Sequence, residues 1–170
     1  GIDKDERALQ IEREEIERTK DFVKLCHRYG IKVELYIQWG TLQYETFLDE
    51  CPEMPDWCVV TEEGQYAGIT YGHQCFRYRP CTTRPGFWDY LRRVIDVALD
   101  EVQADGLGFD NVANTLEPES CHCPECRRAF VAFLKEKYDV ATDAGRRLAT
   151  ERFGFAVLEH VRPPTFNRWN

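Results

Sequence analysis

The sequence predicts an α/β fold in which helices and strands alternate along the chain, and three observations support this prediction. A helical pattern of apolar residues is followed closely by an alternating strand pattern at residues 31–38. A second helix and strand of the same kind occupy residues 86–110, and helical patterns resume at residue 124. Because parallel strands are joined by helical crossovers, this order favours a parallel sheet.

The first predicted helix covers residues 3–29. Leu9, Ile16 and Val23 recur every seven residues and form one apolar stripe. Three further residues widen this stripe: Ile11, Phe22 and Cys26. Gly30 then follows at the position where a glycine commonly ends a helix. Because Cys26 lies on the apolar face of this helix, we expect it in the core.

Both predicted strands have one apolar face and one polar face. In the first strand the apolar residues Ile31, Val33, Leu35 and Ile37 alternate with the polar residues Lys32, Glu34, Tyr36 and Gln38. In the second strand, residues 106–110, Leu107 and Phe109 point one way, whereas Gly108 and Asp110 point the other. The polar faces of the two strands therefore share a side.

The rest of the chain consists of a long loop and three more helices. Residues 39–85 show no helical period, and we expect a short hairpin within them from the stretches "CVV" and "AGITY". Helices are predicted at residues 86–104, 124–138 and 142–152.

A shared polar face does not suit an open sheet that helices cover on both sides. It suits the interior of a TIM-type (β/α)8 barrel, whose upper end holds the active site. A whole barrel needs about 250 residues, whereas this chain has 170. We therefore predict a single domain over residues 1–170 that is part of such a barrel, with long βα loops.

Composition and charge exclude several classes of partner. The formal net charge is −8, which a nucleic-acid surface would repel, and the basic residues are scattered. No apolar run approaches the ~20 residues of a membrane span. No signal peptide is visible, so we expect a cytoplasmic protein, with homo-oligomerisation left open.

Eight cysteines are many for this length, and three of them fall in "CHCPEC" at Cys121, Cys123 and Cys126. An extracellular disulfide framework is one interpretation, and a Cys51–Cys58 pair would belong to it. Cysteines one residue apart, however, cannot bridge each other without strain, whereas they suit a tetrahedral metal ion. We therefore predict a metal site at this cluster.

The stretch "DGLGFDNVANTLEPESCHCPECRRAFVAFLKEKY" resembles the fourth-strand region of family 42 β-galactosidases and related hypothetical glycosyl hydrolases. "PDWCVVTEEG" and "CTTRPGFWDYL" are similar to the segments that lead into the preceding helix of these barrels. The resemblance covers residues 31–138. It implies one structural zinc on the three clustered cysteines and on Cys81, with Cys75 as the alternative fourth ligand and iron as the alternative metal.

The resemblance also implies where the catalytic residues should lie. In the family, the residue after the Asp-Asn pair is the acid/base glutamate, but here that position is Val112. Asp110 is the remaining candidate, as an acid, a nucleophile or a substrate ligand, or else as a residue that orders the loop. The family's nucleophile lies on a late strand, beyond the region that the resemblance covers.

Six residues are candidates for substrate binding: Asn111, Trp39, Gln38, Tyr36, His73 and Arg77. Trp39 could stack on a sugar ring, although plain packing would equally explain it. The sequence thus predicts a glycoside hydrolase-like protein that acts on a carbohydrate O-glycosidic bond and has a structural zinc site at the catalytic rim. The alternative is a non-catalytic, zinc-stabilised relative that binds a sugar or another partner.

Overall fold

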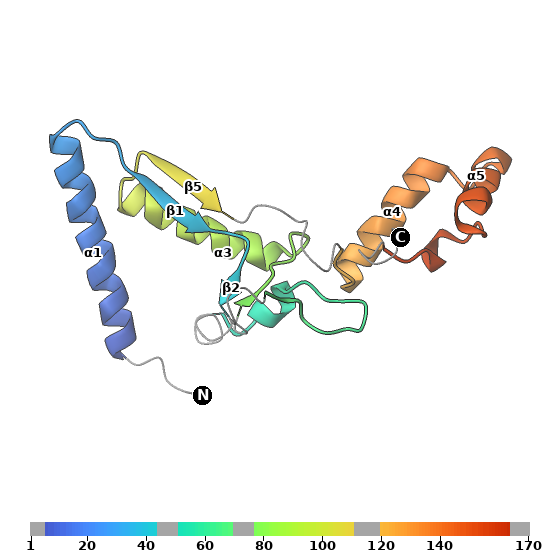
Figure 1. The fold of residues 1–170 in the computed structure, drawn as a ribbon, viewed down its shortest axis with the longest axis horizontal. Helices are drawn as coiled ribbons and strands as arrows, with labels where there is room; N and C mark the ends of the chain where they lie inside the picture. The colour runs from blue at the N-terminus through green and yellow to red at the C-terminus, as the bar shows by residue number, and fades with distance from the viewer. Residues whose placement is uncertain (1–5, 44–50, 70–76, 111–119, 164–170) are drawn as a thin grey trace. The chain divides into compact units, whose positions relative to one another are not determined.

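A computed structural model describes residues 6–43, 51–69, 77–110 and 120–163 (Figure 1). The chain divides into two compact units. Unit 1 comprises residues 1–58 and 68–113, and unit 2 comprises residues 59–67 and 114–170. We describe each unit by itself, and the single domain over residues 1–170 stays a prediction.

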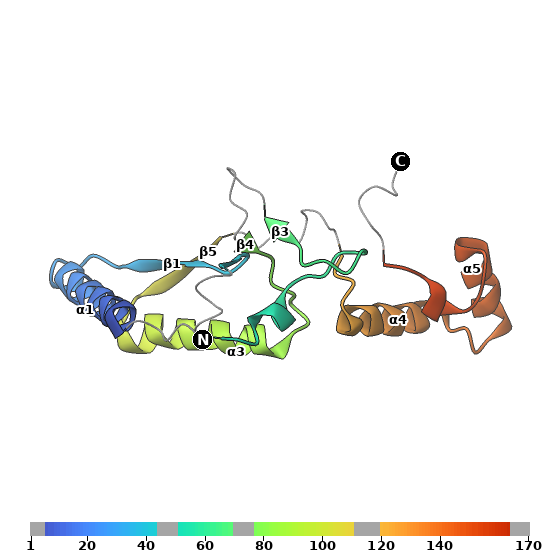
Figure 2. The same cartoon turned by 90° about the horizontal axis from the view of Figure 1, so that it is seen from below.

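Unit 1 contains the predicted α/β arrangement. Strand β1 (Glu34–Gln38) pairs in parallel with strand β5 (Gly106–Asp110). Helix α3 (Pro85–Asp96) precedes β5, continues as the π-helix η2 (Val97–Glu101), and runs along one face of the strand pair (Figures 1 and 2). Buried side chains from both layers fill the space between them. They include Ile37 of the sheet and Phe87, Leu91 and Ala98 of the helix.

The first strand begins later than predicted. Residues 31–33 alternate in the sequence but lie before β1, and the Ile31 side chain is exposed. The strand starts at Glu34 because its partner Gly106 is the first residue of β5. Just before this point, two hydrogen bonds of 2.8 Å join the segments that lead into β1 and β5. The Val33 N–H donates to the Asp105 carboxylate, and the Asp105 N–H donates to the Val33 carbonyl.

Helix α1 (Glu6–Arg28) buries less of its predicted stripe than expected. Val23 is fully buried and Cys26 is half-buried, but Phe22 is 58% exposed and Ile11 is 51% exposed. The expectation that Ile11 and Phe22 belong to a core stripe is therefore wrong for the described part of unit 1. His27 near the end of the helix lies 2.7 Å from the Asp105 carboxylate. The Val33 N–H and His27 together lower the pKa of Asp105.

The long loop contains more regular structure than its sequence indicates. Strand β4 (Arg77–Tyr78) lies between β2 (Leu42–Gln43) and β3 (Gly68–Ile69), and both pairings are antiparallel. The 3-10 helix η1 (Met54–Trp57) inserts two buried side chains, Met54 and Trp57, into the core of unit 1. Strands of two residues leave no alternation that periodicity could detect.

Unit 2 combines the predicted hairpin with two helices. The hairpin segment, residues 59–67, has a bridge between Val60 and Tyr66, so the stretch "CVV" contributes to a hairpin as expected. Gly68 and Ile69 of the stretch "AGITY", however, pair with β4 instead. Helix α4 (Pro124–Tyr138) matches its prediction, and α5 (Asp143–Phe153) is shifted by one residue. The 3-10 helix η3 (Leu158–His160) closes a core around the buried residues Leu134, Ala149 and Leu158.

The described residues form small sheets and no closed barrel. The fold class is therefore confirmed as α/β with a parallel strand pair and a helical crossover, while the barrel remains a prediction. No helix in the described ranges is both long enough and apolar enough to cross a membrane.

The start of α5 gives a test of the unit 2 fold. A Cβ at Gly145 would collide with the backbone carbonyls of Tyr138 and Asp139, which cannot move as a side chain would. We expect Gly145→Ala to lower the free energy of unfolding by about 1–3 kcal/mol through overpacking. Chemical denaturation measures this change.

The control is Gly68→Ala, where the nearest atom to a new Cβ lies 3.8 Å away, at ordinary contact distance. Equal stability of the two variants would contradict the described packing of α5 on the end of α4.

Candidate functional site

The polar face of β1 and β5 brings together the predicted strand residues of unit 1. The parallel register sets Gln38 opposite Asp110 and Tyr36 opposite Gly108. Because parallel partners point to the same side of the sheet, the Gln38 and Asp110 side chains share the face that α3 does not cover. The structure therefore places Gln38 and Asp110 as neighbours at the carboxyl ends of their strands.

Tyr36 is bonded directly to the predicted catalytic carboxylate. Its hydroxyl donates to Asp110 Oδ2 at 2.6 Å, although the Tyr36 side chain is 65% exposed. This hydrogen bond is the main reason why the pKa of Tyr36 is raised, while the positive charge of Arg77 acts in the opposite direction. Arg77 on β4 thus lies close enough to interact with the phenol. The pair is a neutral phenol that donates to a carboxylate.

Two glycines of β5, Gly106 and Gly108, lie beside the Glu34 side chain on this face. A Cβ at Gly108 would lie 3.1 Å from Glu34 Oε1, and one at Gly106 would lie 3.7 Å from Glu34 Cγ. The Glu34 side chain therefore lies over the glycines of β5, on the same face as Tyr36 and Asp110. At Gly108 any larger residue would require the Glu34 carboxylate to shift, whereas the distance at Gly106 is an ordinary contact distance.

Trp39, directly after β1, packs in the core of unit 1. Its indole ring lies 5.9 Å from the Phe87 ring and 5.2 Å from the Trp88 ring, measured between centroids. Packing therefore accounts for this residue, in line with the plainer of the two interpretations. Its Nε1 is buried and has no hydrogen-bond partner among the described residues. Asn111, His73 and Val112 lie outside the described ranges.

The CHCPEC motif forms a compact turn at the start of α4 in unit 2. The sulfur atoms of Cys121, Cys123 and Cys126 all lie within 4.8 Å of one another. Cys123 is the N-cap residue of α4, and its sulfur accepts the Cys126 N–H at 3.4 Å. A helix start of this kind directs backbone N–H groups toward the sulfur of its N-cap residue.

The hairpin segment, residues 59–67, is hydrogen-bonded to this turn. The Val60 N–H donates to Cys121 Sγ at 3.3 Å, and the Val60 carbonyl accepts the His122 N–H at 2.8 Å. N–H donors of this kind orient metal ligands and stabilise their charge. Sequence reasoning missed this support, because it arises from a hairpin some 60 positions earlier in the chain.

Cys81 belongs to unit 1, where it is buried at 2% exposure. Its N–H donates to the Trp57 carbonyl at 2.6 Å, and its sulfur lies 3.1 Å from Thr83 Oγ1. None of the described cysteines forms a disulfide, so Cys51 and Cys58 are not paired with each other. Cys75 lies outside the described ranges.

Neither a protein-family model nor a curated protein matches the sequence. Several solved structures are similar, and two of them match at low identity. A maltogenic α-amylase from Thermotoga neapolitana has 14% identity and a TM-score of 0.47, over 73% of this chain and 26% of its own. A cyclomaltodextrinase has 20% identity and a TM-score of 0.43, over 71% of this chain and 22% of its own. The chain thus spans about a quarter of the length of these proteins.

The Tyr36–Asp110 bond gives a direct test of the polar face. We expect Asp110→Asn to lower the pKa of Tyr36 toward its ordinary value, because the variant removes the charged acceptor that favours the protonated phenol. An NMR titration of ¹³C-labelled tyrosine measures this pKa.

The control is Asp105→Asn, which removes a carboxylate bonded to Val33 and His27 instead. A Tyr36 titration that is unchanged in Asp110→Asn would contradict the described pair.

Proposed function

We propose that this chain is part of a carbohydrate-active barrel of the glycoside hydrolase type, and that the polar face of β1 and β5 contacts the sugar. One observation carries the proposal: Asp110 and Gln38 face the same open side at the carboxyl ends of two parallel strands. In (β/α)8 barrels, the ends of the strands supply the catalytic and binding side chains. The resemblance of the surrounding sequence to family 42 β-galactosidases supports the same assignment.

The residues on this face suit a ligand that is rich in hydroxyl groups. The carboxylate of Asp110 accepts hydrogen bonds, and the amide of Gln38 both donates and accepts them. Tyr36 uses its hydroxyl to orient the carboxylate, and its exposed ring offers an apolar surface.

Within this proposal, Asp110 acts as a carboxylate rather than as a proton donor. A carboxylate that accepts a hydrogen bond from a neutral phenol is suited to bind a sugar hydroxyl or to act as a nucleophile. Hydrolysis then needs a second carboxyl group, about 5–5.5 Å away in a retaining enzyme or about 6.5–9.5 Å away in an inverting one. Val112 at the family's acid/base position favours the second candidate function, a non-catalytic sugar- or partner-binding protein.

We further propose that Cys81, Cys121, Cys123 and Cys126 together hold one structural zinc. The clustered sulfurs of Cys121, Cys123 and Cys126 and their N–H donors in unit 2 support the proposal, since they would supply three of the four ligands of a tetrahedral thiolate site. Four thiolates leave no open coordination position, so the ion would hold loops in place and activate no water.

Covalent continuity supports Cys81 as the fourth ligand. In unit 1, the Cys81 N–H is bonded to the Trp57 carbonyl, and Pro80 forms a bridge with Cys58. In unit 2, the Val60 N–H is bonded to Cys121 Sγ. Residues 57–60 are consecutive, and adjacent Cα atoms are about 3.8 Å apart. A short stretch of chain therefore connects the segment that carries Cys81 to the cluster.

Hydrolysis of aryl glycosides by the full-length protein tests the catalytic assignment. We expect Asp110→Asn to lower turnover by about 100-fold or more, which is the usual scale for a positioned catalytic carboxyl group. The thermal unfolding midpoint should change little, because the Asp110 side chain is exposed.

The control is Asp89→Asn on the exposed face of α3, where the carboxylate pairs only locally with Arg92. Turnover that survives in Asp110→Asn would remove Asp110 from the mechanism. Sugar binding without turnover in the parent would favour the non-catalytic candidate.

Elemental analysis of the purified protein tests the zinc site. We expect about one zinc per chain, and a clear loss of metal in both Cys123→Ser and Cys81→Ser, because each removes one of four thiolates. Cys26→Ser serves as the control, since Cys26 lies on α1 and is not one of the four proposed ligands.

Metal retained in full by Cys81→Ser would show that another group supplies the fourth ligand. Absence of metal from the parent protein would contradict the whole site, and iron in place of zinc would change only the identity of the ion.

A further inference from the structure

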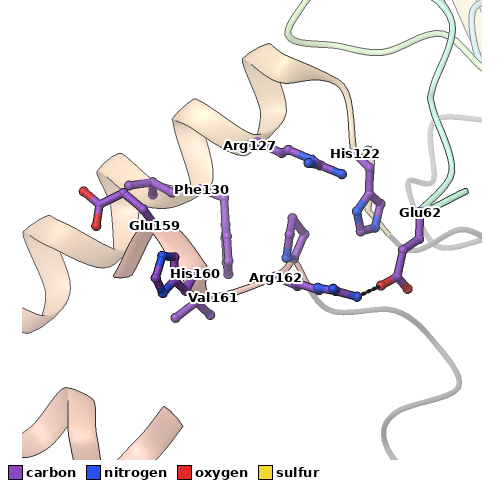
Figure 3. Close-up of a pocket in the computed structure, with 10 residues that line it drawn as sticks. Glu62, His122, Arg127, Phe130, Glu159, His160, Val161 and Arg162 are labelled. Carbon is purple, nitrogen blue, oxygen red and sulfur yellow. Dashed lines mark hydrogen bonds and ion pairs between the residues drawn. The ribbon is translucent and has the colours of Figure 1, made fainter. Parts of the chain in front are cut away.

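A cavity of about 320 Å³ opens in unit 2, between the CHCPEC turn and the residues that follow η3. The side chains that line it come from three segments of unit 2: the hairpin segment, the turn with α4, and residues 159–163 (Figure 3). Its volume lies at the lower end of the range for sites that bind small molecules. Nothing in the proposed glycosidase face or zinc site uses this cavity.

The cationic side chains lie at one end of the cavity. Figure 3 shows Arg127 extending from α4 toward His122, with Arg162 on the facing segment. His122 is 96% buried, since its exposed fraction is 4%, so its ring is fixed in the wall. The imidazole offers a further polar group beside the two guanidinium groups.

The acidic side chains of the lining are already paired with cations. Glu62 accepts a hydrogen bond from Arg162 at 2.9 Å. Glu159 lies 2.6 Å from Lys135, which lowers the pKa of Glu159 and keeps it ionised in that pair. Arg127, by contrast, has no ion pair among the residues that the structure describes. The lining therefore has one positive charge that no described carboxylate offsets.

Apart from His160, the remaining lining is apolar. Phe130, Val131, Val161 and Pro163 contribute carbon surface, and Phe130 and Val161 also pack on the core of unit 2. A bare inorganic ion would leave this surface uncovered. A compact carbon body with one anionic group would cover it and would place its charge at Arg127.

We propose that this cavity binds a small organic carboxylate, with the carboxylate on the Arg127 guanidinium and the apolar body against Phe130 and Val161. A guanidinium can hold a carboxylate through two parallel N–H···O bonds, which gives both affinity and orientation. The assignment concerns unit 2 alone and does not depend on glycosidase activity. A zinc ion bound at the cysteine cluster would stabilise one wall of the cavity indirectly, because the hairpin segment that supplies Glu62 is bonded to Cys121 through Val60.

Isothermal titration of the purified protein with four probes tests the proposal. Benzoate has both the charge and the apolar body, acetate has only the charge, benzamide has only the body, and inorganic phosphate is a different anion. We expect saturable binding of benzoate, weaker binding of acetate and phosphate, and none of benzamide.

Arg127→Gln should weaken benzoate binding about tenfold or more, the scale of one charge-assisted hydrogen-bond pair. Arg128→Gln is the matched control, because Arg128 is the next residue on α4, does not line the cavity and pairs with Glu125 at 2.7 Å. It should bind benzoate as the parent does. Circular dichroism confirms that each variant is folded.

Three results would overturn the assignment. They are absence of benzoate binding to the folded parent, equal affinity in Arg127→Gln and the parent, and tighter binding of phosphate or benzamide than of benzoate. Zinc content measured on the same samples separates a failure of this site from a failure of the metal site.

Discussion

Parallel hydrogen bonding between β1 and β5 sets the register in which Gln38 lies opposite Asp110, and the candidate function of unit 1 depends on this register. A slip of β1 by one residue would turn Tyr36 and Gln38 toward α3, away from the face that carries Asp110, and would bring apolar side chains of β1 to the open face. The core prevents such a slip, because Ile37 is 7% exposed and packs with Phe87 and Leu91 of the helix. Packing on one face of the sheet thus determines the chemistry of the other.

The sequence predicts those features that one segment decides by itself. The bounds of α4 follow from Pro124 in its first turn and from an apolar pattern that ends at Tyr138, and the structure confirms both. The alternation of residues 34–38 correctly identifies the two faces of β1. The sequence does not predict features that a distant partner decides. The start of β1 depends on Gly106, and the hydrogen bond from Tyr36 to Asp110 joins residues 74 positions apart.

The same distinction applies to the cysteines. Local spacing predicts that Cys121, Cys123 and Cys126 lie together, and the structure places their sulfurs within one small cluster. The Val60 N–H that supports Cys121 could not be predicted, since it requires the hairpin segment to belong to unit 2 rather than to unit 1. His122, which lies between Cys121 and Cys123 in the motif, is buried and forms part of a cavity wall. A single turn therefore contributes both to the candidate metal site and to the candidate carboxylate site.

The claim that the polar face of β1 and β5 contacts a sugar is tested most directly by NMR. Amide chemical shifts of the ¹⁵N-labelled protein can be followed during titration with methyl glycosides of galactose, glucose, mannose and xylose. The account predicts that at least one sugar causes saturable shifts, and that the largest occur at Tyr36, Gln38 and Asp110. Absence of shifts with every sugar, or shifts confined to α4 and α5, would contradict it.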